Sequence, residues 1–231
     1  MTHLEMASAI RNRVADGLSG NISDQSFSLE QLYDEIDLAR ADFVNKYSTT
    51  FKLNSKYLIQ QLDKLELIMT DLSSDICSSI PNCDSQVPAV QIPALLATPD
   101  DSAIEFLGLT NKQEEFSVYY NVADIQNHRV RVRTAHRPFA WVDTSMNANG
   151  KNTLYFFNLG KYNPLKFVSA RAMFNHPSDL LALDPNALSR EYPAPLHMQL
   201  AIVDSLTEKY IRYYRQLNVQ PMPNQQNDII K

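Results

Sequence analysis

The stretch from Ala194 to Leu217 constrains the fold of this chain more than any other, because its pattern predicts one long helix with a wide apolar face. Placing successive residues 100° apart gathers the apolar and aromatic side chains within one arc of about 180°. They are Leu196, Leu200, Ile202, Val203, Leu206, Tyr210, Ile211, Tyr213, Tyr214 and Leu217. A surface helix needs an apolar stripe only a little wider than about 100°. We therefore expect this helix to contact two elements, one of them in a neighbouring subunit.

Composition narrows the classes of protein to which the chain can belong. Its 231 residues are enough for one large domain or two small ones. A net charge of -5 and a pI near 5.5 argue against a general nucleic-acid binder, which needs positive charge to neutralise phosphates. No apolar stretch approaches the ~20 residues of a membrane span, and the N-terminus lacks the basic-then-apolar order of a signal peptide. We expect a soluble protein made inside a cell.

Glycine and cysteine are both scarce. The chain has 5 glycines, whereas the usual frequency of about 7% would give about sixteen. Their spacing cannot form the glycine-rich loops that cradle phosphates, so we expect no nucleotide chemistry of that kind. Cys77 and Cys83 are close enough in sequence to leave one disulfide open, but they lack the partner ligands of a zinc site. The simplest expectation is two reduced thiols in a loop.

Apolar residues spaced three and four apart predict helices in the N-terminal part. The first runs from Leu4 to Leu18 and the second from Leu29 to Tyr47. Ser28 and Gln31 fit a capping box at the start of the second helix. A third helix is expected to begin near residue 55 and to carry Leu58, Leu62 and Leu65. Its end stays open, because residues 65–72 fit either a helix or a strand.

Alternating apolar residues predict strands in the middle of the chain. The expected strands lie within residues 116–120, 130–132, 139–142, 154–157 and 167–174. Asn149-Gly150 suits the tight turn of a hairpin between two of them. Four prolines between residues 81 and 99 predict an extended loop or an edge segment, because proline lacks the N–H that a sheet ladder needs.

This order of elements predicts an α+β fold, in which N-terminal helices and a long C-terminal helix pack with a mostly antiparallel β block. We expect a helical region at residues 1–65 and a β-rich region at 66–180, with the proline-rich loop at 81–99. The long helix should occupy residues 190–217, and an extended tail residues 218–231. The regular alternation of strand and helix in a doubly wound sheet is missing.

Three arginines in the β-rich region are candidate interface residues. Arg129, Arg131 and Arg133 alternate with valines, so on a strand they would project from one face about 7 Å apart. Three interpretations stay open. The arginines can form a solvated sheet face, pair with carboxylates of an adjacent subunit, or contact a nucleic-acid backbone without reading its sequence.

The other candidate interface residues lie near the C-terminus. Tyr210, Tyr213 and Tyr214 share the apolar face of the long helix, and their spacing favours a core or interface role over a platform for a ligand. In the tail, Ile229 and Ile230 end an otherwise polar segment and could anchor it on a partner.

No pattern of catalytic residues is present. The 5 histidines are scattered, without an HExxH motif or a cysteine at a recognisable spacing, and no GxSxG motif surrounds a serine. The adjacent carboxylates at 100–101 and 114–115 are typical of solvated polar segments. We therefore expect no catalytic residue, no cofactor and no metal, and a protein that is not an enzyme.

Several short phrases of the sequence together resemble virion structural proteins of the crAss-like phages, which infect gut Bacteroidota. These phrases are SFSLEQL at 26–32, PFAW at 138–141, NLGKYN at 158–163, FNHP at 174–177 and LTEKYIRYYRQ at 206–216, with PNQQ at 223–226. They are packing and turn motifs, spread over nearly the full length of the chain. The resemblance implies a ring or head-to-tail adaptor protein in the neck or tail of the virion, made in the cytoplasm of the bacterial host.

The resemblance also implies partners. A closed homo-oligomer of about twelve copies would surround the channel through which the genomic DNA passes, between the portal and neighbouring tail or ring proteins. No membrane is involved. Two alternatives stay open: a binding module that decorates the capsid or tail, and a cryptic hydrolase that uses the scattered acids and histidines.

Overall fold

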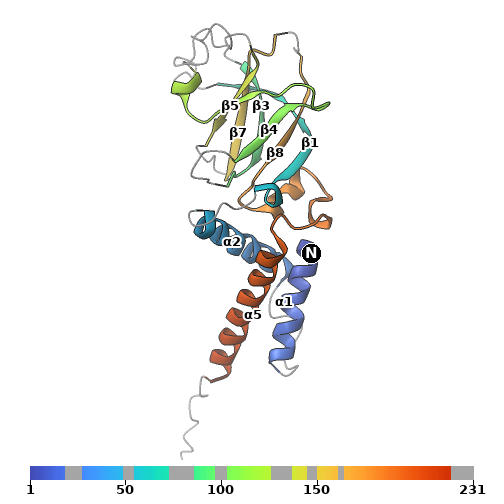
Figure 1. The fold of residues 1–231 in the computed structure, drawn as a ribbon, viewed down its shortest axis with the longest axis vertical. Helices are drawn as coiled ribbons and strands as arrows, with labels where there is room; N and C mark the ends of the chain where they lie inside the picture. Colours follow the sequence, from blue (N-terminus) through green and yellow to red (C-terminus); the bar gives the residue numbers. More distant parts are fainter. Residues whose placement is uncertain are drawn as a thin grey trace, which may run out of the picture. The chain divides into compact units, whose positions relative to one another are not determined.

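The structure is a computed structural model that describes residues 1–18, 28–48, 55–72, 86–96, 103–125, 137–144, 150–160 and 164–219. The chain divides into two compact units (Figure 1). Met1–Arg40 and Leu188–Lys231 form a helical unit, and Ala41–Ala187 form a β unit. The fold is α+β, with sheets that are mostly antiparallel, as the sequence predicts.

The helical unit contains α1 (His3–Gly17), the first part of α2 (Leu29–Ser48) and α5 (Leu196–Val219). The capping box predicted for the second helix is confirmed. The backbone N–H of Gln31 donates to the Ser28 hydroxyl at 3.1 Å, and the Ser28 N–H donates to the Gln31 side chain at 3.2 Å. All three long helices lie close to their predicted positions.

Helix α1 packs against α5 (Figure 1). The two helices run in the same direction, because the start of α1 lies beside Gln199 and its end lies beside Ile211. A Cβ added at Gly17 would come within 2.6 Å of the Ile211 side chain, so glycine allows a close approach of the helices there. Among the side chains that the structure describes, the buried apolar residues of the two helices are Met6, Ala7, Ile10, Val14, Met198, Ile202, Val203 and Leu206.

The β unit contains two sheets. The first has the strand order β1 (Gln60–Glu66), β8 (Phe167–Ala172), β4 (Ile104–Leu109). The second has the order β2 (Ile68–Asp71), β3 (Gln86–Pro93), β7 (Lys151–Phe157), β6 (Phe139–Asp143), β5 (Ser117–Tyr119). Between the strands of the described ranges, every pairing is antiparallel except that of β5 with β6. Short 3-10 helices lie at η1 (Ser55–Tyr57), η3 (Pro177–Ala182) and η4 (Ala187–Ser189).

The main core of the β unit lies between the two sheets, since strands of both contribute to one cluster of buried residues. The second sheet also has an apolar opposite face, where Val87, Phe139, Trp141 and Phe157 pack with Ile125. Strand β6 is therefore buried on both faces, and Phe139 to Val142 are each at most 6% exposed.

The third predicted helix is wrong. Only η1 is helical there, and residues 60–66 form strand β1, so the predicted helical region at 1–65 is also wrong over its last residues. The ladder between β1 and β8 shifts register between Leu62 and Leu65. Such a bulge adds one residue, which returns both leucines to the same buried face although they are three residues apart. The spacing that suggested a helix is the signature of a bulged strand.

The proline-rich loop predicted at 81–99 is wrong over residues 86–93, which form strand β3. The prolines are tolerated because the neighbours of β3 are offset along it. Pro88 pairs with Met69 of β2, but the ladder between β3 and β7 does not extend as far as Pro88. Pro93 pairs with Lys151 of β7, but the ladder between β3 and β2 does not extend as far as Pro93. Each proline thus has a paired strand on one side only, as a proline on an edge strand does.

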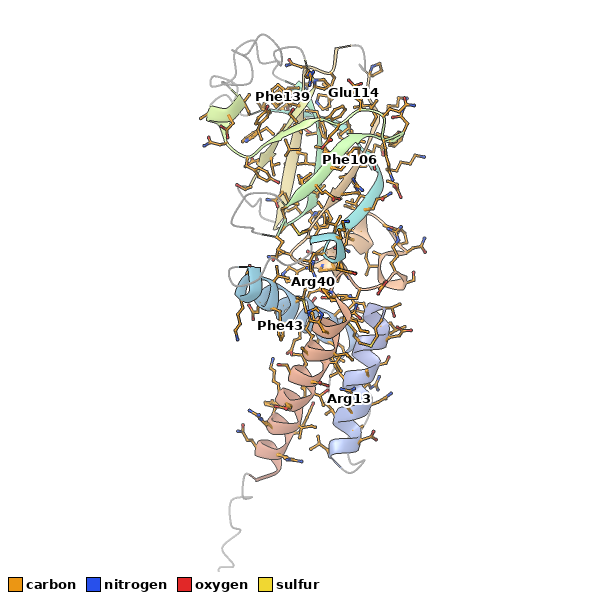
Figure 2. The ribbon with its side chains drawn as sticks, in the orientation of Figure 1. Arg13, Arg40, Phe43, Phe106, Glu114 and Phe139 are labelled. Carbon is orange, nitrogen blue, oxygen red and sulfur yellow. The ribbon has the colours of Figure 1, made fainter. Side chains whose placement is uncertain are left out.

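A close turn after β4 gives a testable prediction. Gly108 lies close to Phe106 and Glu114, which are labelled in Figure 2. A Cβ on Gly108 would lie 2.1 Å from the carbonyl oxygen of Glu114 and 2.9 Å from the Phe106 ring. Backbone cannot move aside as a flexible side chain can, so Gly108→Ala should lower the free energy of unfolding by about 1–3 kcal/mol. Urea denaturation measures this. Gly17→Ala is the control, because its obstacle is the end of the Ile211 side chain, and a change as large there would contradict the steric explanation.

Candidate subunit interface

The wide apolar face of α5 is only partly covered by the described residues. Toward the start of the helix, Leu196 is 61% exposed and Leu200 is 43% exposed, while Met198 and Ile202 are buried. Near its end, Tyr213 is 54% exposed. The arc predicted from the sequence is therefore present, but the helical unit uses only part of it.

The second half of α5 and the first turns of α2 enclose a groove with a volume of about 510 Å³. We call it the tyrosine groove. Its lining residues are Gln31, Asp34, Glu35, Lys209, Tyr210, Tyr213 and Tyr214. Three of the candidate interface residues, the tyrosines, are thus brought together at one place on the surface of the helical unit.

The tyrosine groove combines aromatic surface with charge. Lys209 Nζ lies 3.0 Å from Glu35 Oε2 and 5.9 Å from the centre of the Tyr210 ring. Burial, followed by the charge of Glu35 and a hydrogen bond to it, raises the pKa of the Tyr210 hydroxyl. This hydroxyl therefore stays protonated near neutral pH. Asp34 adds an exposed carboxylate to the lining.

Two of the tyrosines pack on one another. The rings of Tyr213 and Tyr214 meet edge to face, with centroids 5.4 Å apart, and Tyr214 is more covered than Tyr213. A pair of this kind is rigid and amphipathic, because each ring offers an apolar face and a hydroxyl. The groove suits an apolar segment that also offers hydrogen-bond acceptors or a positive charge.

The remaining candidates lie outside the described residues. These are the arginines Arg129, Arg131 and Arg133, the tail isoleucines Ile229 and Ile230, and the cysteines Cys77 and Cys83. Their predicted roles stay predictions.

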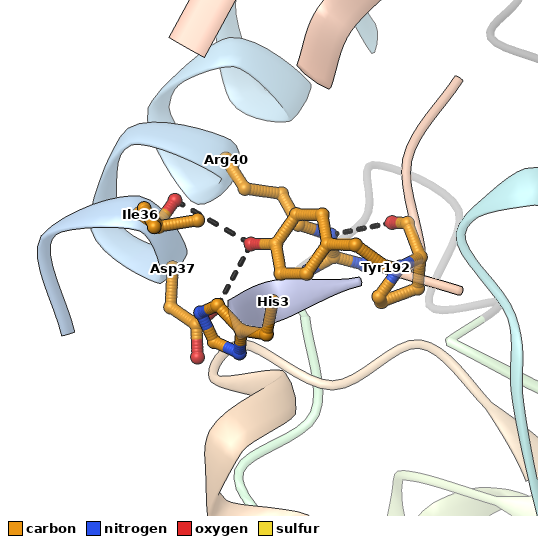
Figure 3. Close-up of polar contacts among 6 residues, drawn as sticks. His3, Ile36, Asp37, Arg40 and Tyr192 are labelled. Atoms are coloured by element: carbon orange, nitrogen blue, oxygen red, sulfur yellow. Dashed lines mark hydrogen bonds and ion pairs between the residues drawn. The ribbon is translucent and has the colours of Figure 1, made fainter. Parts of the chain in front are cut away.

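A buried polar cluster in the helical unit was missed by the sequence reasoning (Figure 3). The Tyr192 hydroxyl donates to Asp37 Oδ1 at 2.8 Å, and Arg40 Nε donates to the Pro193 carbonyl oxygen at 2.8 Å. His3 Nε2 lies 3.4 Å from the same Asp37 oxygen. Both Asp37 and Arg40 are fully buried. The sequence does contain one signal of this cluster, because Asp37 and Arg40 interrupt the apolar face of the helix predicted at 29–47.

The cluster connects the start of α1, the middle of α2 and the segment before α5. Burial, and then the charge of Asp37, raise the pKa of the Tyr192 hydroxyl well above its ordinary value. The Tyr192 proton is therefore held in a hydrogen bond to a buried carboxylate, and Arg40 supplies the positive charge. The Tyr192 hydroxyl and Arg40 Nε are thus satisfied, whereas His3 Nε2 makes no hydrogen bond to the described residues. The bonds that form link the segment before α5 to α2.

The position of His3 predicts a pH dependence of stability. Burial lowers the pKa of its imidazole below the ordinary 6.5, and the nearby Asp37 only partly offsets this. Between about pH 6.5 and the lowered pKa, the unfolded chain therefore binds more protons than the folded chain. The contribution of His3 to the free energy of unfolding is largest at neutral pH and decreases as the pH falls through this window. Urea denaturation at steps from pH 7.5 to 5 measures the slope.

The control for this pH dependence is His3→Gln, which cannot titrate. Its curve of unfolding free energy against pH should be flatter than that of the unaltered protein over the same window. Identical slopes in the two proteins would mean that His3 is not responsible.

Two further features were sought among the residues that the structure describes, a metal-binding cluster and a membrane-spanning helix. No group of three or more His, Cys, Asp or Glu side chains there could hold a metal ion. No helix in the described ranges has both the length and the apolar content of a membrane span. The sequence matches no protein-family model, and a search of curated proteins finds no match either.

Proposed function

We infer that this chain is a phage virion structural protein that closes into a homo-oligomeric ring around the DNA channel, as a head-to-tail adaptor or neck component. The observation that carries the proposal is the apolar and aromatic surface that α5 leaves open, with Tyr213 at 54% exposure beside a groove of about 510 Å³. The resemblance of the sequence phrases to crAss-like phage proteins supports the choice of a virion role.

The physics of such a ring is geometric. A contact between two different patches of identical subunits repeats until rotation closes it, so each subunit is held on two sides. Burying one large apolar side chain contributes about 1.5–3 kcal/mol. A few tyrosine and leucine contacts at each junction are then enough, because both junctions of a subunit must open before it leaves.

Charge also fits a channel wall. The net charge of -5 repels the phosphate backbone, so DNA can pass without being held. Within this proposal, Arg129, Arg131 and Arg133 pair with acidic residues of an adjacent subunit. Charge reversal at these arginines should weaken assembly, whereas unchanged assembly would place them on the open surface.

The test of the proposed function is the oligomeric state of the purified full chain. Native mass spectrometry should give a closed oligomer of about twelve copies, and negative-stain images should show rings with a central hole. Labelled copies in purified particles should lie on the portal axis. A purified chain that is monomeric or trimeric, together with labelled copies spread over the capsid, would instead support the decorating module. That result would overturn the proposed ring.

Tyr213 offers a prediction specific to the interface. Tyr213→Asp should weaken association about 30-fold or more, because a buried aromatic at an interface is a common hot spot worth about 2 kcal/mol or more. Its effect on the unfolding of the subunit should stay within about 0.5 kcal/mol, since the side chain is exposed in the described structure. Mass photometry over a dilution series measures the association.

The matched control is Tyr57→Asp, which places the same charge at another tyrosine that is 60% exposed. It should leave association unchanged. Equal weakening by both substitutions would show a general effect of charge and would remove Tyr213 from the interface.

A further inference from the structure

The tyrosine groove lies next to the point where the chain continues beyond α5. The helix ends at Val219, about two turns past Tyr213, and twelve further residues follow, 220–231. These residues lie outside the described part of the structure. We propose that the tyrosine groove of one copy binds the C-terminal segment 220–231 of a second copy.

The chemistry of the segment matches the groove. Pro221, Met222 and Pro223 are consecutive, and proline-rich segments bind in grooves lined by aromatic side chains because little conformational entropy is lost on binding. A methionine sulfur also packs favourably against aromatic rings. The isoleucines Ile229 and Ile230 supply the branched apolar side chains that the exposed tyrosine faces can cover.

Charge fits as well. Lys231 is the only cation of the segment and Asp228 is its only acidic residue, while the groove lining carries both signs of charge, with Asp34, Glu35 and Lys209. Glu35 already pairs with Lys209 at 3.0 Å, so the exposed Asp34 is the carboxylate better placed to attract a cation. Such a pair orients the segment and contributes little affinity, because it is screened by solvent.

The direction in which the chain leaves α5 favours binding of the segment to the groove of a second copy over binding to the groove of its own copy. The groove is lined by residues within 209–214 of α5, so the last turns of the helix lead away from it toward Val219. Proline pushes the residue before it toward extended backbone, so the sequence around Pro221 and Pro223 favours an extended segment over further helix. The segment contains no glycine for a tight turn. Ten residues in extended form span roughly 33 Å, which is enough to reach a neighbouring subunit.

This inference rests on the proposed ring and deepens it. The tyrosines and the tail isoleucines, which are separate candidates in the sequence, become the two sides of one contact. A groove on one copy and a segment on the next are different surfaces, as a heterologous contact requires. The pairing therefore gives the ring its direction.

Photo-cross-linking of the full chain tests the pairing. Ile230 is replaced by p-benzoylphenylalanine, and chains of natural isotope content are mixed with ¹⁵N-labelled chains before irradiation. Mass spectrometry should then find the tail joined to peptides that carry residues 31–35 or 209–214, with pairs of mixed isotope content present. Cross-links confined to one chain, or directed to other peptides, would overturn the proposal.

Substitutions in the tail give a second measurement. Ile229→Asp combined with Ile230→Asp should weaken association about tenfold or more. Gln225→Asp combined with Gln226→Asp adds the same charge and should change association less than about twofold. Rings that persist in the isoleucine variant would refute the role of the tail while leaving the proposed function intact. A monomeric unaltered chain would instead refute the proposed function.

Discussion

Replacing Arg40 by methionine is expected to lower the free energy of unfolding by about 3–5 kcal/mol. Arg40 is fully buried, donates to the Pro193 carbonyl oxygen at 2.8 Å and interacts electrostatically with Asp37, which is also fully buried. Methionine has a similar reach but no charge. It therefore removes the positive charge that compensates a carboxylate inside the helical unit. Urea denaturation followed by far-ultraviolet circular dichroism measures the loss.

Arg212→Met is the matched control. Its side chain is 77% exposed and pairs with Glu208 at 2.9 Å, so the change should stay within about 0.5 kcal/mol. Adding Asp37→Asn to Arg40→Met should recover part of the stability, because asparagine still accepts the Tyr192 hydrogen bond without a charge. A coupling energy of at least about 1 kcal/mol is expected. An Arg40→Met variant as stable as the control would rule out Arg40 as the compensating charge.

The long helices could be predicted because local signals decide them. The capping box of Ser28 and Gln31 and the spacing of Leu32 and Ile36 act within one or two turns, and the structure confirms the helix from Leu29 onwards. The strands with aromatic residues were equally accessible, since four of the buried side chains of β6 and β7 are aromatic, namely Phe139, Trp141, Phe156 and Phe157.

The errors arose where tertiary pairing outweighs local pattern. Strand β1 has leucines at a helical spacing, but the bulge between Leu62 and Leu65 exists only because β8 is there to pair with it. Strand β3 contains two prolines, which local rules place in a loop or at an edge. The offset of β2 and β7 along β3 removes the conflict, and this offset is a property of the sheet that no short window of sequence contains.

The candidate site shows the same division. Periodicity placed Tyr210, Tyr213 and Tyr214 on one face of α5, but it could not show which helix lies opposite, so Asp34 and Glu35 were missed. The buried polar cluster was harder still. Tyr192 and Asp37 are 155 positions apart in the sequence, and only the folded chain brings them together.

The second large effect is expected at Phe139, where alanine should cost about 3–5 kcal/mol of unfolding free energy. Phe139, which is labelled in Figure 2, is fully buried. Its ring stacks on Phe157 at 5.1 Å and meets Tyr119 edge to face at 5.8 Å. The cost of such a truncation depends on whether the surroundings can collapse into the cavity. Strand β6 cannot move toward it freely, because Ala140 and Val142 on its other face belong to the core between the sheets.

The fluorescence of Trp141, the only tryptophan of the chain, reports on this strand directly during urea denaturation. Tyr57→Ala, at a side chain 60% exposed in the same unit, should change the unfolding free energy by less than about 0.5 kcal/mol. Phe139→Leu should fall between the two, because it leaves a smaller cavity. A Phe139→Ala cost near 1 kcal/mol would mean that β6 does move into the space, and that the two apolar faces of the sheet do not hold it in place.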